Sequence, residues 1–241
     1  MQSDWLVRTQ LLLGEEKLAF LKNKNVLVVG LGGVGGAAAD MICRAGIGNM
    51  TIVDGDVIEV SNINRQLPAL HSTVGMKKAH VMAHRLKDLN PELNLEVIDQ
   101  YLVDETMKEL AAREFDYIVD AIDTLTPKFQ LVTAALACNR KIVSSMGAGG
   151  RLNPAFIRVA DISQTHDDNL ARALRKMLHK VNIHKGFKAV FSSEKVIEGS
   201  IVEQMGVNKR STVGTISYMP PIFGCFCASV VVQDLVKGFA D

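Results

Sequence analysis

Short apolar runs alternate with amphipathic stretches along the chain as far as Gly150. The runs are rich in β-branched residues and predict strands at Asn25–Val29, Met50–Val53, Leu95–Ile98, Tyr117–Val119 and Lys141–Val143. Apolar residues recur at helical spacing between them and predict helices at Ala37–Ala45, Val74–Leu89, Asp104–Arg113 and Pro127–Cys138. Strands that alternate with helices indicate an α/β fold, Rossmann-like and doubly wound around a mainly parallel sheet.

The pattern changes after Gly150. This part of the chain predicts a single helix, Leu170–Val181, a polar stretch from Ser192 to Thr212, and strands at Phe156–Val159, Lys188–Phe191 and Thr215–Ser217. No linker rich in Gly, Ser or Pro separates it from the first part. We therefore expect one domain over residues 1–241. Its core spans about 8–150, and an elaborated C-terminal part at about 151–241 faces the substrate.

Composition narrows the class of protein. The 241 residues carry a formal net charge of +1 and are 48% hydrophobic, which excludes intrinsic disorder. A charge so close to neutral argues against a wholly basic nucleic-acid-binding protein, although a local basic patch remains compatible with it. The segment Met1–Leu13 lacks the features of a secretory signal. The apolar run Ile222–Val232 is shorter than the ~20 residues of a membrane span, so we expect a cytoplasmic protein.

The four cysteines point away from zinc and disulfide chemistry. They are Cys43, Cys138, Cys225 and Cys227, and no two form a C-x-x-C pair. Cys225 and Cys227 lie in the apolar run, where we expect buried free thiols.

A glycine-rich turn is the first candidate binding site. It follows the strand Asn25–Val29 and contains Gly30, Gly32, Gly33 and Gly35 in the pattern G-x-G-x-x-G. In this context the turn brings a phosphate close to the backbone and to a helix N-terminus. Asp54, at the end of the next strand, can accept a hydrogen bond from a ribose hydroxyl. The pattern predicts a nucleotide site, and taken alone it favours NAD.

Polar residues after Asp54 change this interpretation. They are Asp56, Asn62, Arg65, Gln66 and Lys78, and Asp123 follows a later strand. Arg65 and Lys78 can neutralise charge on a pyrophosphate leaving group, and Asp123 can hold Mg²⁺ against phosphates. Each residue alone has an ordinary structural explanation, but the set favours a reaction that splits ATP.

These residues together resemble the adenylating core of the ubiquitin-activating-enzyme-like superfamily, from about Arg8 to Gly150. The resemblance implies that Asp54 binds the ATP ribose, that Asn62, Arg65 and Lys78 contact phosphates, and that Asp123 binds Mg²⁺. Asp56 and Gln66 are expected to line the ATP site. The resemblance further implies a homodimer in which Arg8 reaches across the interface to the partner's ATP. The sulfur-carrier activators of this superfamily commonly carry two C-x-x-C pairs, and many have a catalytic cysteine, whereas this chain has neither.

Five further segments are similar to the tRNA threonylcarbamoyladenosine dehydratase branch of that superfamily. They are Arg8–Glu16, Met146–Pro154, Val159–Thr165, Phe191–Lys195 and Gly214–Pro220. This resemblance implies that ATP adenylates the threonyl carboxylate at adenosine 37 of tRNA. The activated carboxylate then cyclises with loss of AMP, and no protein cysteine takes part. With these segments, the likeness extends over nearly the whole chain. A monovalent cation is a further candidate ligand, and a sulfur-relay or carrier protein is a candidate partner.

A basic stretch predicts where tRNA binds. Between Asn169 and Ser193 there is no acidic residue, and the cations are Arg172, Arg175, Lys176, Lys180, Lys185 and Lys188. Arg172, Arg175 and Lys176 are expected to point away from the apolar helical face formed by Leu170, Leu174, Met177, Leu178 and Val181. Lys209 and Arg210 add a second basic patch. The alternative is an ordinary solvated helix face. His166 is a candidate base only by its proximity to this stretch.

Four functions are compatible with the sequence. The first is the tRNA dehydratase, and the second is an adenylyltransferase that activates the C-terminal glycine of a ubiquitin-like sulfur carrier. The third is an NAD-dependent dehydrogenase, which only the glycine turn favours. The fourth is a binding module without catalysis. We rank them in this order, because Asp54, Arg65, Lys78 and Asp123 together suit ATP chemistry.

Overall fold

The computed structural model describes residues 4–203 and 211–239 of the chain. The helices are α1 (Val7–Leu13), α2 (Glu15–Lys22), α3 (Gly33–Arg44), α4 (Lys78–Leu89), α5 (Asp104–Ala112), α6 (Leu125–Ala137), α7 (Asn169–His179) and α8 (Met219–Lys237). The strands are β1 (Asn25–Val29), β2 (Asn49–Val53), β3 (Asn94–Ile98), β4 (Tyr117–Asp120), β5 (Ile142–Ser145), β6 (Ile157–Asp161), β7 (Lys188–Ser192), β8 (Ile201–Glu203) and β9 (Ser211–Val213). The described 3₁₀ turns are η1 (Asp4–Leu6), η2 (Val60–Asn62), η3 (His71–Thr73), η4 (Pro154–Phe156) and η5 (Ile162–Gln164).

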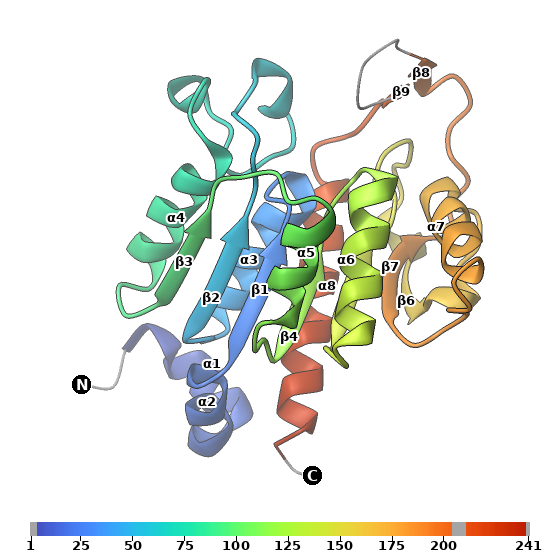
Figure 1. Cartoon of the computed structure of the whole chain (residues 1–241). Coiled ribbons are helices and arrows are strands. Elements are labelled where there is room, and N and C mark those ends of the chain that lie inside the picture. The colour runs from blue at the N-terminus through green and yellow to red at the C-terminus, as the bar shows by residue number, and fades with distance from the viewer. Residues whose placement is uncertain (1–3, 204–210, 240–241) are drawn as a thin grey trace.

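Seven strands form one twisted sheet in the order β3-β2-β1-β4-β5-β7-β6 (Figure 1). All neighbouring pairs are parallel except β6 and β7. The strand order reverses between β1 and β4, as in doubly wound nucleotide-binding folds, so ligands are expected beyond the carboxyl ends of these strands. This confirms the fold class expected from the sequence.

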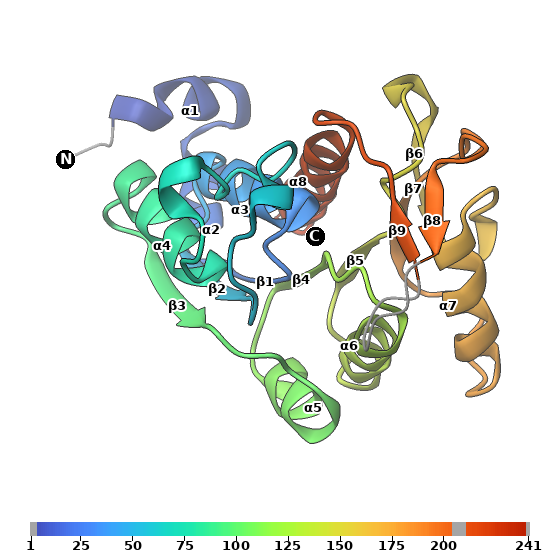
Figure 2. The same ribbon diagram turned by 90° about the horizontal axis from the view of Figure 1, so that it is seen from above.

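Helices cover both faces of the sheet (Figures 1 and 2). In β1, Val26 and Val28 belong to a buried cluster with α3, α4 and α8, while Leu27 and Val29 belong to a second cluster with α5, α6 and α7. Because successive side chains of a strand point to opposite faces, the continuous apolar run of β1 is what a strand covered on both faces requires.

The C-terminal part extends the sheet and then returns to the core. The β8–β9 hairpin lies beyond the carboxyl ends of the strands (Figure 1). Gly150, after β5, donates its amide to Gly214 O at 2.8 Å. Asn64 Nδ2, in the first part of the chain, donates to Thr215 O at 2.9 Å. The elaborated part is therefore tied to the edge of the sheet where the nucleotide is expected.

Several expected element boundaries were wrong. The strand expected at Thr215–Ser217 is absent from the described structure, because Asn64 takes the Thr215 carbonyl and the chain bends into α8. The helix expected from Val74 begins at Lys78, since Gly75 has a φ of +86°. The helix expected from Ala37 begins at Gly33, inside the glycine turn.

The apolar run Ile222–Val232 forms part of a second helix, α8, after Gly150, where we expected only one. By length and composition alone this 19-residue helix could cross a membrane, but half of its apolar window is buried in the protein. A Cβ on Gly224 would lie 2.3 Å from Val34 O, so α8 packs closely on α3. It occupies the position of a core helix (Figure 1).

Candidate functional site

The glycine turn has the geometry of a phosphate site. Gly30 has a φ of +86°, and a Cβ on Gly35 would lie 1.7 Å from Gly30 O, so neither position accepts a side chain. Gly32 is the N-cap of α3, and no side chain caps that helix within the described structure. The amides at the start of α3 therefore remain available to an anion.

Asp54 fixes the turn from the end of β2. Its carboxylate accepts hydrogen bonds from the amides of Leu31, at 2.6 Å, and Asp56, at 2.8 Å. Burial raises the pKa of the Asp54 carboxyl, and Lys78 and the two amides oppose this change. Asp54, the residue predicted to bind the ribose, thus also fixes the conformation of the glycine turn, which would hold the phosphates.

Lys78 and Asp56 form an ion pair beside this carboxylate. Lys78 is the first residue of α4 and is buried, and its Nζ lies 2.7 Å from Asp56 Oδ2. The Tyr101 hydroxyl donates to Asp56 Oδ1, and this bond raises the pKa of Tyr101 to about 12. A Cβ on Gly55 would lie 2.8 Å from the Tyr101 ring, so the ring covers this loop. Tyr101 was not expected from the sequence, because its backbone belongs to the segment after β3.

The loop after β2 brings the remaining expected residues to the glycine turn. Asn62 is buried, and its Oδ1 accepts from the amide of Glu59 at 3.1 Å. Arg65 Nη1 donates to Ser61 O and Asn64 Oδ1, both at 2.9 Å. The Gln66 side chain lies 3.6 Å from where a Gly32 Cβ would stand. Its Oε1 is buried and has no hydrogen-bond partner among the described residues, as in a site that a ligand completes.

Asp123 follows β4 and is exposed at the same edge of the sheet. The described residues contain no group of three His, Cys, Asp or Glu side chains arranged for a metal. Mg²⁺ is commonly held by one or two carboxylates together with substrate phosphates, so a single aspartate beside the glycine turn fits this ion.

A buried ionic network beneath Asp123 was missed in the sequence. Lys128, in α6, and Asp120, the last residue of β4, are both fully buried, with Nζ and Oδ2 2.7 Å apart. Ser144 of β5 completes the network. A lysine within the apolar stretch of α6 was the only signal in the sequence, and its partners lie on two other elements.

A second missed cluster links the C-terminal part to this edge of the sheet. Arg151 is buried and pairs with Asp168 at 3.3 Å, and its guanidinium also donates to the carbonyls of Gly147, Asp167 and Glu194. Asp168 caps α7 by accepting from Ala171 N at 2.8 Å. The loop after β5 is therefore fixed to the start of α7.

Arg8 is not near the other expected residues of its own chain. It is the second residue of α1, a helix that directly follows Leu6. Leu6 packs beside Gly46, just before the amino end of β2. The glycine turn lies at the carboxyl end of β1. Within one chain, the structure therefore does not place Arg8 in the site.

The basic helix α7 is only partly as expected. Arg172 and Lys176 are exposed, but Arg175 is half-buried and donates to Thr165 Oγ1. Lys188 pairs with Asp234 at 2.6 Å, and Val181 lies past the end of the helix and is exposed. Lys209 and Arg210 lie outside the described residues. His166 is on the surface, 2.9 Å from Asp167.

The thiols of Cys43, Cys225 and Cys227 are poor nucleophiles. Burial raises the pKa of Cys43 to about 11 and that of Cys227 to about 12. Cys225 is exposed, contrary to our expectation, and partial burial raises its pKa as well. Low thiolate content makes a thioester on these residues chemically unfavourable.

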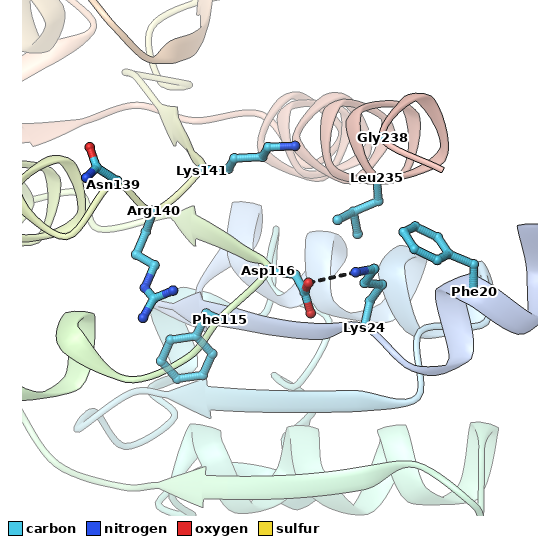
Figure 3. Close-up of a pocket in the computed structure, with 9 residues that line it drawn as sticks. All are labelled: Phe20, Lys24, Phe115, Asp116, Asn139, Arg140, Lys141, Leu235 and Gly238. Carbon is cyan, nitrogen blue, oxygen red and sulfur yellow. Dashed lines mark hydrogen bonds and ion pairs between the residues drawn. The ribbon is translucent and has the colours of Figure 1, made fainter. Parts of the chain in front are cut away.

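A cavity of about 220 Å³ lies at the opposite ends of the strands from the glycine turn (Figure 3). It contains the ion pair between Lys24 and Asp116, 2.9 Å apart, with Lys24 above the ring of Phe20. Asp116 directly precedes β4, so the cavity is at the amino ends of the strands. None of the residues expected to bind ATP lines it.

The likeness to known proteins extends over nearly the whole chain. The model of the ThiF family matches residues 6–238. A tRNA threonylcarbamoyladenosine dehydratase of Bacillus subtilis (strain 168) is 36% identical over 238 residues, which cover 95% of this chain and 94% of that protein. The crystal structure of the E. coli tRNA N6-threonylcarbamoyladenosine dehydratase TcdA in complex with ATP has a TM-score of 0.88 at 32% identity, covering 97% of this chain and 94% of the other. The sulfur carrier protein ThiS adenylyltransferase of Escherichia coli (strain K12) is 33% identical over 141 residues, 58% of this chain and 55% of that protein.

Proposed function

The chain belongs to the ThiF family, and we propose that it is an ATP-dependent tRNA threonylcarbamoyladenosine dehydratase. The observation that carries this proposal is the extent of the likeness. The dehydratases match the C-terminal part as well as the nucleotide core, whereas the sulfur-carrier adenylyltransferase matches little more than half of the chain. The geometry at the carboxyl ends of the strands supports it, because the glycine turn, the Asp54 carboxylate and the buried Lys78 ammonium lie together there.

The proposed reaction has two steps. The threonyl carboxylate of the tRNA nucleoside attacks the α-phosphorus of ATP, and pyrophosphate leaves while Arg65 and Lys78 stabilise its charge. A nucleophile within the same nucleoside then attacks the activated carbonyl and releases AMP. Because nucleophile and acyl group belong to one substrate, this step is intramolecular and gains a large effective concentration. No protein thiol is needed, in agreement with the raised pKa values of the buried cysteines.

Asp123 is the proposed ligand of Mg²⁺, which would neutralise charge on the phosphates of ATP. Asp54 is the proposed ligand of the ribose, and Asp56, Asn62 and Gln66 line the site. The buried Oε1 of Gln66 supports this placement, because a bound donor would satisfy it.

We also propose a homodimer in which α1 contributes to the partner's site. The helix has no buried residue, and Leu11 and Leu12 are each 82% exposed. Two adjacent exposed leucines on a short helix are typical of a surface that a second chain covers. Such an interface would supply Arg8 in trans, since Arg8 is remote from the glycine turn of its own chain.

The exposed face of α7, with Arg172 and Lys176, is the proposed contact for the tRNA backbone. Cations concentrated on one face of an otherwise neutral protein suit a limited phosphate footprint. The link through Arg151 and Asp168 would keep this helix in register with the site. A tRNA substrate also favours a cytoplasmic protein.

The first experiment is to measure AMP and pyrophosphate release from ATP with two tRNA pools. One pool carries threonylcarbamoyladenosine, and the other comes from cells unable to make it. We expect AMP release only with the modified pool, together with the loss of one water from the nucleoside by mass spectrometry. Pyrophosphate release without any dependence on tRNA, but with dependence on a ubiquitin-like sulfur carrier, would instead support the adenylyltransferase.

A further inference from the structure

The Lys128 ammonium is fully buried, and all of its donors are used. Its Nζ donates to Asp120 Oδ2 at 2.7 Å, to Ser144 Oγ at 3.1 Å and to Ser145 O at 2.9 Å. An ammonium has three protons, and these are three acceptors. The side chain thus joins the start of α6 to the carboxyl ends of β4 and β5, which are neighbours in the sheet.

Asp120 connects this buried network to the loop that contains Asp123. Its Oδ2 accepts from Ser144 Oγ at 2.5 Å, and its Oδ1 accepts from the amide of Ile122 at 3.1 Å. Ile122 directly precedes Asp123. The position of the Asp123 backbone is therefore set by a carboxylate that Lys128 and Ser144 hold in place.

The same loop touches the glycine turn. Ala121 N donates to Val29 O at 2.9 Å, and Ala121 O lies 2.8 Å from where a Cβ on Gly30 would stand. A shift of the Ala121 carbonyl would thus displace both the glycine turn and Asp123.

A buried ion pair is an inefficient way to stabilise a core. Removing two charges from water has a large cost, and well-packed apolar residues of similar volume often stabilise a protein as well or better. A fully satisfied network, however, restricts its members to one arrangement. We propose that Lys128 is a positioning residue, which acts through Asp120 and Ile122 to hold Asp123 where it can bind Mg²⁺ with ATP. This inference rests on the proposed role of Asp123 and adds a residue that touches neither ligand.

The test is the affinity for α,β-methylene ATP, measured by calorimetry with Mg²⁺ and again with EDTA. The ratio of the two affinities reports the contribution of the metal and requires no tRNA. We expect Lys128→Met to lower this ratio about 10-fold, as substitutions behind a metal ligand commonly do. Lys128→Arg, which keeps the cation, should retain more of the ratio. Combined with Asp123→Asn, Lys128→Met should cause no further loss, because both act through one carboxylate.

Tyr117→Phe is the matched control. Tyr117 lies on the same strand as Asp120, at its other end, and its buried hydroxyl donates to Asp234 Oδ2 at 2.8 Å. This variant should lower the melting temperature and leave the ratio at the wild-type value. If Lys128→Met fails to fold, Lys128→Gln carries the test, since it removes the ion pair with Asp120 and keeps hydrogen-bond donors in the buried network.

The outcomes separate this inference from the proposed function. A wild-type ratio in folded Lys128→Met, or in Lys128→Gln where Lys128→Met fails to fold, would overturn the positioning role while Asp123→Asn still lowers the ratio. A wild-type ratio in Asp123→Asn would overturn the metal role of Asp123 and this inference with it.

Discussion

Asp123 is exposed, although it follows a fully buried strand, and this contrast allows its function to be separated from its effect on stability. Asp123→Ala removes a carboxylate from the surface, so we expect the free energy of unfolding to change by less than about 1 kcal/mol. The same substitution removes the proposed metal ligand. Pyrophosphate release with modified tRNA should therefore fall by about 100-fold or more.

The control for Asp123→Ala is Asp116→Ala, at the other end of β4. Asp116 pairs with Lys24 and accepts from Asn25 N at 2.8 Å, so its loss should reduce stability and preserve turnover. Urea denaturation and a pyrophosphate assay on both variants give the comparison. Wild-type turnover in Asp123→Ala would remove the role that we assign to it.

Residues were predictable from the sequence where their partners are close along the chain. The glycine turn and Asp54 form a local pattern with a known geometry, and both lie where the pattern implies. Lys128 and Arg151 were missed because their partners come from other elements, and nothing in a single sequence reports that pairing. Burial of a charged side chain depends on the whole fold.

At the scale of elements, hydrophobic periodicity located the helices and strands of the core to within a few residues. It failed where a tertiary contact decides the conformation. Residues Thr215–Ser217 have the composition of a strand, yet the Thr215 carbonyl bonds to Asn64 across the molecule. Gly33 has low helix propensity but begins α3, because a Cβ there would lie 2.7 Å from Pro220 Cβ and 3.0 Å from Arg65 O, so contacts with other elements exclude a larger residue.

At the scale of elements, we predict that the charged face of α7 contributes to tRNA binding. Arg172→Glu/Lys176→Glu reverses two exposed charges opposite the buried Leu174 and Leu178. We expect tRNA affinity to fall about 10-fold or more, and its logarithmic dependence on salt to weaken by roughly 0.7–0.9 for each phosphate that the helix no longer neutralises. ATP affinity should not change, since neither side chain belongs to the glycine turn.

The matched control for α7 is Lys22→Glu/Lys108→Glu, which makes the same change of charge on α2 and α5. Both lysines are exposed. Filter binding at several salt concentrations distinguishes the two double variants. Equal tRNA affinity in all three proteins would show that α7 is an ordinary solvated helix.

At the scale of the whole molecule, the position of Arg8 decides whether one chain is sufficient for catalysis. Arg8 lies in α1 at the amino end of the sheet, and the glycine turn lies at the carboxyl end. If a partner supplies Arg8, each active site combines Arg8 of one chain with Asp123 of the other chain. A dimer with one chain of each kind then contains one site with both residues intact.

Mixing the two inactive variants should therefore restore activity. Random exchange makes half of the dimers mixed, each with one competent site of two, so turnover should recover to about a quarter of the wild-type value. Sedimentation analysis must show a dimer under the same conditions, and Leu11→Asp/Leu12→Asp, which places charges on the exposed face of α1, should abolish both the dimer and the recovery. Inactivity of a mixture in which exchange is demonstrated would mean that Arg8 acts within its own chain or not at all.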